Sequence, residues 1–217
     1  MTLPALINKT QDNINRNRLK REYSLFQQAF QQISAENDFA FKNALSQCQN
    51  TGKTQHACLK NLFKQKLKTA ADCDKNNGTN LGKCFVQHKD VRFLNGNPAN
   101  SGKGGGYFNS NTTSGLVLDD GSSVSLWLDS TECTAFKENN IQRCAFLVID
   151  VNGPKLKPNT WGKDLFLFFI YADKIVPADK SNTDACLGDG DECDGYSDDC
   201  EAGKNYGLTC ASKYLFE

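Results

Sequence analysis

The sequence LKREYSLFQQAFQQI, residues 19–33, decides how the N-terminal part of this chain folds. Its apolar positions lie three or four residues apart, the spacing of one face of an α-helix, at Leu19, Tyr23, Phe26, Phe30 and Ile33. The stripe can continue through Phe41, Leu45 and Cys48, and no Gly or Pro interrupts it after Pro4. We therefore expect one helix from about Pro4 to Cys48, roughly 65 Å long, whose N-terminal part protrudes from the domain.

Beyond this helix the sequence predicts a second helix and four strands. Residues 54–67 place Cys58, Leu59, Leu62 and Phe63 on one side of a shorter helix, and residues 72–106 are rich in turn signals. Alternating or β-branched runs follow at 114–118, 122–128, 144–151 and 165–172. Strands at hairpin spacing favour an α+β fold, in which the long helix packs on a four-stranded antiparallel sheet with disulfide-tied loops.

The length suits a single domain over residues 1–217. We divide it into the long helix (1–48), a short helix with an irregular loop insertion (49–113), the sheet (114–177) and an acidic, disulfide-rich tail (178–217). The tail from residue 184 onward is expected to be loop. The irregular loop and the acidic tail are the surfaces where a partner would be sought, because long loops often carry function.

Ten cysteines, an even and high number, predict a disulfide framework and therefore an oxidising compartment. They are Cys48, Cys58, Cys73, Cys84, Cys133, Cys144, Cys186, Cys193, Cys200 and Cys210. The alternative is metal-binding thiols, but no CxxC pair occurs, which argues against zinc knuckles. Proximity in sequence suggests Cys48 with Cys58, Cys73 with Cys84, Cys133 with Cys144, and two bridges within the tail.

Charges are balanced overall, with 25 basic and 25 acidic residues. The basic residues lie on the predicted helices rather than among aromatic residues on a sheet face, so the sequence gives no support for a nucleic-acid partner. The first part is basic and residues 184–201 are acidic, which fits either head-to-tail packing of subunits or two solvated faces.

Neither a secretory signal peptide nor an apolar stretch of about 20 residues is visible, so we expect the native N-terminus to lie upstream of Met1.

A long N-terminal helix followed by an antiparallel sheet resembles the type IV pilin and type II secretion pseudopilin family. Three pieces of sequence carry the resemblance: Leu3-Pro4-Ala5-Leu6 before a polar helix, Asp120-Gly121-Ser122 leading into residues 124–127, and the D-x-N-G … P-N … G-x-D-x-F pattern. That pattern is formed by Asp150-Val151-Asn152-Gly153, Pro158-Asn159, Gly162, Asp164 and Phe166. The family's processing site and hydrophobic segment are absent from this chain.

The resemblance implies a structural role: a minor pilin or pseudopilin that assembles with other pilin subunits into a pilus or a secretion pseudopilus. It implies anchoring in the inner membrane through the missing hydrophobic helix, followed by a periplasmic or cell-surface location in a filament. The alternative is a secreted calcium-dependent adhesin or lectin-like binding module. Of these features, only the oxidising, extracytoplasmic location is also predicted by the cysteines.

Calcium is the one candidate cofactor. Asp189, Asp191, Asp194, Asp198 and Glu201 follow the spacing of an EF-hand loop with one inserted residue, although no EF-type helices flank them. The alternative is a solvated acidic loop held by disulfides. A second oxygen-rich group is Asp150, Asn152 and Asp164, for which we favour the interpretation that the side chains cap a long hairpin loop.

No catalytic residues are predicted, and we do not expect an enzyme. His56 and His88 are the only histidines, and both lie in polar segments. A Cys-His nucleophile would need an unpaired thiol, and an even cysteine count leaves none. A nucleophile elbow of the GxSxG type is also absent.

Overall fold

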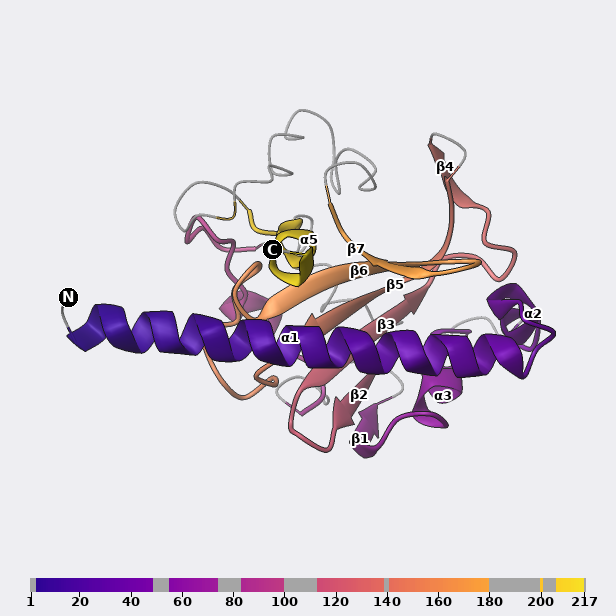
Figure 1. The fold of residues 1–217 in the computed structure, drawn as a ribbon, viewed down its shortest axis with the longest axis horizontal. Coiled ribbons are helices and arrows are strands. Elements are labelled where there is room, and N and C mark those ends of the chain that lie inside the picture. The colour runs from indigo at the N-terminus through magenta and orange to yellow at the C-terminus, as the bar shows by residue number, and fades with distance from the viewer. Residues whose placement is uncertain are drawn as a thin grey trace.

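The computed structural model of the chain describes residues 3–48, 55–73, 83–99, 113–138, 141–179, 200 and 206–216. It has the predicted α+β architecture, with a long N-terminal helix lying across one face of an antiparallel sheet (Figure 1). The helix comes first in the chain and the sheet follows, as the sequence predicts.

The long helix, α1 (Leu3–Ala35), is 33 residues long, which corresponds to about 50 Å. Its C-terminal half is buried against the sheet: Leu19, Phe26 and Ile33 are at most 1 % exposed. Tyr23 stacks on Phe168 of the sheet, with ring centroids 5.5 Å apart. The N-terminal end extends past the edge of the sheet (Figure 1), so only part of the helix contributes to the core.

The prediction that this helix continues to Cys48 is wrong. Asp38 and Phe39 adopt positive φ angles of 54° and 60°, a left-handed conformation that interrupts an α-helix. The chain then enters a separate helix, α2 (Phe41–Ser46). Phe41 stacks on Phe30 with ring centroids 4.5 Å apart, so the apolar stripe identified the buried residues correctly although the helix breaks between them.

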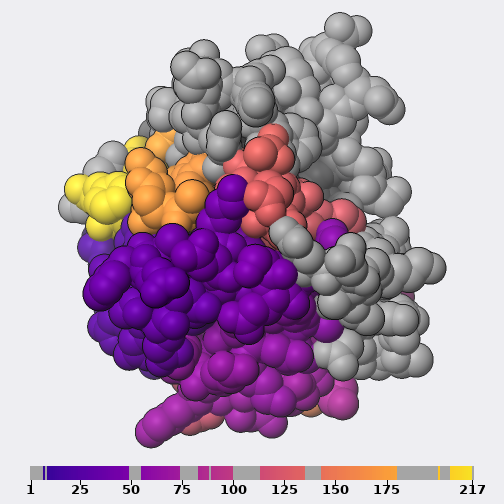
Figure 2. Space-filling view, turned by 90° about the vertical axis from the view of Figure 1, so that its right-hand side faces the viewer, coloured from indigo at the N-terminus to yellow at the C-terminus, as the bar shows by residue number. Residues whose placement is uncertain are grey.

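The predicted second helix is α3 (Gln55–Lys64). Its Phe63 packs against Phe26 of α1, with ring centroids 5.3 Å apart. A disulfide between Cys48 and Cys58 joins the end of α2 to α3. Seen from this end of the molecule, α2 and α3 form one continuous surface (Figure 2).

Among the residues that the structure describes, the sheet has seven strands rather than the four predicted. They are β1 (Thr69–Cys73), β2 (Ser114–Leu118), β3 (Ser123–Leu128), β4 (Ala135–Glu138), β5 (Ile141–Asp150), β6 (Leu165–Tyr171) and β7 (Ile175–Pro177). All pairings are antiparallel, in the order β1-β2-β3-β5-β6-β7, with β4 pairing with β5. The four predicted strands are β2, β3, β5 and β6. The three missed strands have three to five residues each, too few to give a clear alternation.

The strand register divides the buried side chains between two faces. Leu126, Leu147 and Phe168 are direct neighbours across three strands and belong to the core under the helices. Val148 and Leu167, one position along, form the next cross-strand pair and belong to a second core on the opposite face. Every residue of β6 is buried, which explains its continuous apolar sequence.

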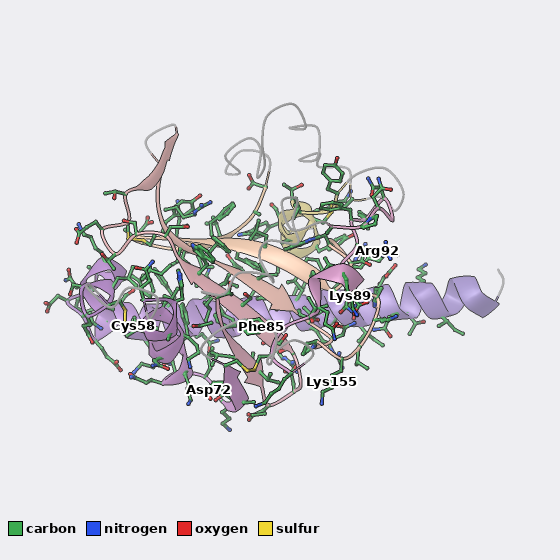
Figure 3. The ribbon with its side chains drawn as sticks, turned by 180° about the vertical axis from the view of Figure 1, so that it is seen from behind. Cys58, Asp72, Phe85, Lys89, Arg92 and Lys155 are labelled. Carbon is green, nitrogen blue, oxygen red and sulfur yellow. A yellow bond between two sulfur atoms is a disulfide. The ribbon has the colours of Figure 1, made fainter. Side chains whose placement is uncertain are left out.

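The second face is covered by part of the segment for which the sequence predicts an irregular loop insertion. Residues 83–99 include a 3₁₀ turn, η2 (His88–Asp90), and bury Val91 and Phe93 against the sheet together with Trp161. In Figure 3, seen from behind, this segment lies in front of the strands. The described part of the insertion therefore forms a layer of the core and is not a free loop.

The prediction that the tail is loop throughout is also wrong. Residues Cys210–Phe216 form a helix, α5, next to α1 (Figure 1). Tyr214 lies edge-on to Phe166 with ring centroids 6.1 Å apart, and the Arg16 guanidinium lies 4.1 Å from the centre of the Tyr214 ring. The helix is stabilised by these contacts, because a seven-residue sequence has little helical tendency of its own.

Four disulfides are described: Cys48–Cys58, Cys73–Cys84, Cys133–Cys144 and Cys200–Cys210. The first three are the pairings that proximity suggested, and the fourth is a bridge within the tail. Such a set of bridges indicates an oxidising, extracytoplasmic environment. Within the described ranges, no helix combines the length and apolar character that crossing a bilayer requires.

Candidate functional site

The most unusual chemistry of the described structure lies where α1 crosses one end of the sheet. Two connections meet the helix there, the β2–β3 turn (residues 119–122) and the β5–β6 loop (residues 151–164). We call the polar residues of this contact the polar seam. They are Asn15, Arg18, Arg21 and Glu22 of α1, Asp120 and Ser122 of the turn, and Asp150, Asn152 and Asp164 at and within the β5–β6 loop.

Asp164 organises the β5–β6 loop. Its side chain is fully buried and accepts hydrogen bonds from the backbone N–H groups of Asn159, over 2.7 Å, and Thr160, over 2.6 Å. Burial raises the pKa of this carboxyl to about 6, although the backbone hydrogen bonds oppose the shift. The carboxylate thus holds the Pro158-Asn159 part of the D-x-N-G … G-x-D pattern in place.

Asp150 begins the same loop at the end of β5. It is 2 % exposed, and its Oδ1 accepts a hydrogen bond from the Gly153 N–H over 2.9 Å. Burial raises the pKa of this carboxyl well above its usual range, and the nearby charge of Asp164 raises it further. Two buried carboxyl groups therefore lie close enough to interact.

Asn152 lies between these two acids. Its side-chain amide donates a hydrogen bond to the Lys157 carbonyl over 3.2 Å, and a hydrogen bond with Asn152 helps to lower the pKa of Asp164. The structure thus brings Asp150, Asn152 and Asp164 together, in agreement with the interpretation that they cap a hairpin loop.

Gly153 follows Asn152 with a φ of +85°, which favours glycine. A Cβ at this position would collide with the carbonyl oxygen of Gly121 in the β2–β3 turn. The Asn-Gly sequence therefore serves two purposes: it makes the turn, and it lets the two connections touch. This close approach is what places both connections under the same stretch of α1.

The helix is joined to the β5–β6 loop by two hydrogen bonds. Asn15, which is 1 % exposed, donates from its side-chain amide to the Lys163 carbonyl over 3.1 Å. The Arg18 guanidinium donates to the Val151 carbonyl over 3.3 Å. Both acceptors are backbone groups at the two ends of the loop, so the helix position depends on the loop conformation.

A charged group joins the helix to the β2–β3 turn. Arg21 forms ion pairs with its neighbour Glu22, over 2.6 Å, and with Asp120. Asp120 also accepts hydrogen bonds from the Ser122 N–H, over 3.0 Å, and the Ser122 hydroxyl, over 2.7 Å. Glu22 is fully buried, and burial raises the pKa of its carboxyl despite the adjacent Arg21. A cavity of about 460 Å³ next to this group extends to Leu25 and residues 66–68.

Sequence reasoning identified the acidic residues of the loop but missed the helical side of the polar seam. The missed residues are Asn15, Arg18, Arg21 and Glu22. Asn15 and Glu22 continue the spacing of the buried stripe, four residues before and three after Leu19. A polar residue within an apolar helical stripe is the signal that would have found them, because buried polar groups need partners.

His56 is placed for a structural role. Its Nδ1 accepts a hydrogen bond from the Leu128 N–H over 2.8 Å, and its ring packs on Trp127 at 4.6 Å between centroids. Burial lowers the pKa of His56 to about 4, so the ring is neutral at physiological pH and its Nδ1 is already occupied. The side chain of His88 lies outside the described residues.

The predicted calcium residues Asp189, Asp191, Asp194, Asp198 and Glu201 all lie outside the described residues, as do Cys186 and Cys193. In the part of the chain that is described, no group of three or more His, Cys, Asp or Glu side chains is arranged to hold a metal ion.

Comparisons with protein-family models, with curated proteins and with solved structures find no match to this chain. Its function must therefore be argued from its own residues.

Proposed function

We propose that the chain is a structural subunit of an extracytoplasmic filament of the pilin or pseudopilin type, in which α1 makes the contacts between subunits. The observation that carries the proposal is the division of α1 into a part that packs on the sheet and its loops, from Asn15 onward, and a shorter N-terminal part that protrudes. A 33-residue helix is much longer than the sheet needs for its own core.

The exposed apolar residues of α1 support this role. Ile7, Ile14 and Leu25 are 58 %, 42 % and 37 % exposed. Their spacings of 7 and 11 residues correspond to nearly whole helical turns, so the three side chains lie along one face of the helix. Exposed apolar side chains aligned on one face suit contact with another helix or subunit.

The polar seam gives the protruding helix a fixed direction. Asn15 and Arg18 bind the β5–β6 loop, and Arg21 binds the β2–β3 turn. A helix that transmits contacts between subunits needs such a rigid connection to its globular part. The disulfides suit an assembly exposed outside the cell.

The proposed role is not enzymatic, and it includes other pilin subunits as partners and anchoring in the inner membrane before assembly. The membrane segment would precede Leu3 in the full-length protein, as the family resemblance implies. A secreted calcium-dependent adhesin or lectin-like module remains the alternative prediction. It depends on the acidic tail, which lies outside the described residues.

Filament incorporation tests the proposal. The full-length gene, tagged at its C-terminus, would be expressed in its native host, and surface filaments would be sheared off and probed for the tag. We expect the chain in this fraction. The double variant Ile7→Asp/Ile14→Asp should fold with an unchanged melting midpoint but be lost from the filaments. Gln31→Asp, on an exposed and different face of α1, is the matched control and should still be incorporated. If the double variant is incorporated as well as the control, α1 does not make the contact.

A further inference from the structure

Phe39, in the turn between α1 and α2, presents its side chain to solvent. It is 87 % exposed, the highest exposed fraction of any large apolar side chain among the residues that the structure describes. Its φ of 60° and the φ of Asp38, 54°, are left-handed, a conformation that costs about 1–2 kcal/mol per non-glycine residue. Neither the backbone conformation nor the exposed ring favours folding of the isolated chain, so the turn points to a role in binding.

Hydrogen bonds of Asn37 hold this turn in place. Its side-chain amide donates to the Ile33 carbonyl over 2.8 Å, and its Oδ1 accepts a hydrogen bond from the Gln47 side chain over 3.0 Å. The Ala40 N–H donates to the Asn37 carbonyl over 3.1 Å. The turn lies at the end of the molecule, where α1 meets α2 (Figure 1), and is tied to both helices. Phe39 is therefore presented in one position, which lowers the entropy cost of binding.

A cavity elsewhere on the same chain has walls that suit a phenyl ring. It is the cavity of about 460 Å³ beside α1, and its apolar walls are formed by Leu25, Leu67 and Leu118. Leu25 is 37 % exposed, so this wall faces solvent. A phenyl ring fits within this volume, and aromatic side chains that fill apolar pockets are the usual anchors of protein interfaces.

The charged residues beside the ring and the cavity are complementary. Asp38 directly precedes the exposed ring, and Lys68, in the segment before β1, is exposed and lines the cavity. Two acids of the β2–β3 turn also line the cavity: Asp120, which is paired with Arg21, and Asp119. An acid beside the ring and a lysine at the cavity favour one orientation of the incoming turn.

We propose that Phe39 of one copy of this chain inserts into the cavity beside Leu25 of a second copy. Leu25 lies about 15 Å before the end of α1, so the ring and the cavity occupy different parts of the surface. The contact is therefore heterologous, and each copy can receive one neighbour while it binds another. This inference goes beyond the filament proposal, because the chain can make this contact without any other subunit.

The test is sedimentation equilibrium of the purified chain with its disulfides intact. Protein concentrations from about 1 to 500 µM are needed, because contacts built on one anchor are weak. We expect the average mass to rise with concentration. Phe39→Asn removes the ring, and asparagine tolerates a left-handed φ, so this variant should melt no lower than the parent but associate at least tenfold more weakly. Phe216→Asn, at a second exposed phenylalanine, 69 % exposed, is the matched control and should associate like the parent.

A second variant tests the cavity, and a mixture tests whether ring and cavity bind each other. Leu25→Arg keeps a good helix former but fills and charges the cavity, so it should also lose association. Mixed in equal amounts, Phe39→Asn and Leu25→Arg should form a dimer and nothing larger, because each pair holds one intact ring and one intact cavity. The proposal is overturned if the parent is monomeric throughout, if either variant alone associates like the parent, if Phe216→Asn loses association as well, or if the mixture stays monomeric.

Discussion

The side-chain amide of Asn15 on α1 donates a hydrogen bond to the backbone carbonyl of Lys163, 148 positions later in the chain, over 3.1 Å. The bond is partly buried and joins the first helix to the loop between the two longest strands. It lies next to the contact of Arg18 with Val151, so this stretch of α1 is attached to both ends of the same loop.

Removing the Asn15 amide should destabilise the fold. Asn15→Ala would leave the Lys163 carbonyl without its donor, and we expect the free energy of unfolding to fall by about 1–2 kcal/mol. Urea unfolding followed by circular dichroism measures this. Gln28→Ala, at an exposed position of the same helix, is the control and should change stability by less than about 0.5 kcal/mol. Equal effects of the two substitutions would show that the hydrogen bond contributes nothing.

A comparison of alanine substitutions at Gly96 and Gly153 distinguishes the cost of a strained backbone from the cost of a steric clash. Gly96 and Gly153 have nearly the same φ, +88° and +85°, but a Cβ at Gly96 would have no neighbour within 4 Å, whereas one at Gly153 would collide with the Gly121 carbonyl. Gly96→Ala should therefore cost about 1 kcal/mol. Gly153→Ala should cost at least about 1 kcal/mol more, because the two connections must move apart. Thermal unfolding of both variants measures the difference, and equal costs would contradict the close approach.

His56 should make stability depend on pH. Its pKa is about 4 in the folded state against an ordinary value of 6.5, so the unfolded chain binds the proton more readily. The stability contribution is therefore complete above pH 6.5 and is lost as the pH falls through the window from 6.5 to 4. Between pH 7.5 and pH 5 we expect a loss of about 2 kcal/mol from this group.

The variant His56→Asn keeps a side-chain acceptor but cannot titrate. Its stability should fall by about 2 kcal/mol less than that of the wild type between the same two pH values. Urea unfolding at pH 5 and 7.5 gives both numbers. Parallel pH profiles of the two proteins would mean that His56 is not held neutral by burial.

Two of the described disulfides close chain segments of equal length, so their contributions to stability can be compared directly. Cys48–Cys58 and Cys200–Cys210 both have a sequence separation of 10, so removing either should release a similar chain entropy, worth about 3 kcal/mol. We expect the double serine variant of Cys48 and Cys58 to lose more stability, because Cys48 is a buried member of the core cluster around α1–α3 and Cys58 packs against that cluster. Differential scanning calorimetry would compare the midpoints. A larger loss on removing Cys200–Cys210 would contradict this ranking.

The helices and strands whose apolar residues follow a strong periodic spacing could be predicted from the sequence. The apolar stripe of α1 and the long runs of β5 and β6 each carry enough buried residues to define one helix face or one strand. The break at Asp38 and Phe39 could not be predicted, because neither residue is a glycine or a proline and the helical spacing of apolar residues continues past them to Phe41 and Leu45. The helix α5 was missed for a similar reason, since its stability comes from contacts of Tyr214 with distant residues.

Of the polar seam, the residues at and within the β5–β6 loop could be predicted from the sequence, whereas those on α1 could not. Asp150, Asn152 and Asp164 are close together in sequence, and a turn signal at Gly153 connects them. The α1 residues that bind this loop, Asn15 and Arg18, are more than 130 residues away from their acceptors Lys163 and Val151. Local sequence patterns contain no information about which loop a helix will contact. The pairing of loop and helix follows from the antiparallel order of the sheet, which places both connections at the same end.

The central claim, that α1 makes the contacts between subunits, is tested most directly by crosslinking in the native host. A photoreactive amino acid would replace Ile14 in the full-length protein, with Gln31 as the control position, and cells would be irradiated under conditions in which filaments form. The account predicts crosslinked products of this chain with itself or with another filament subunit from position 14 and few or none from position 31. Efficient export without any crosslinked product from position 14 would contradict it.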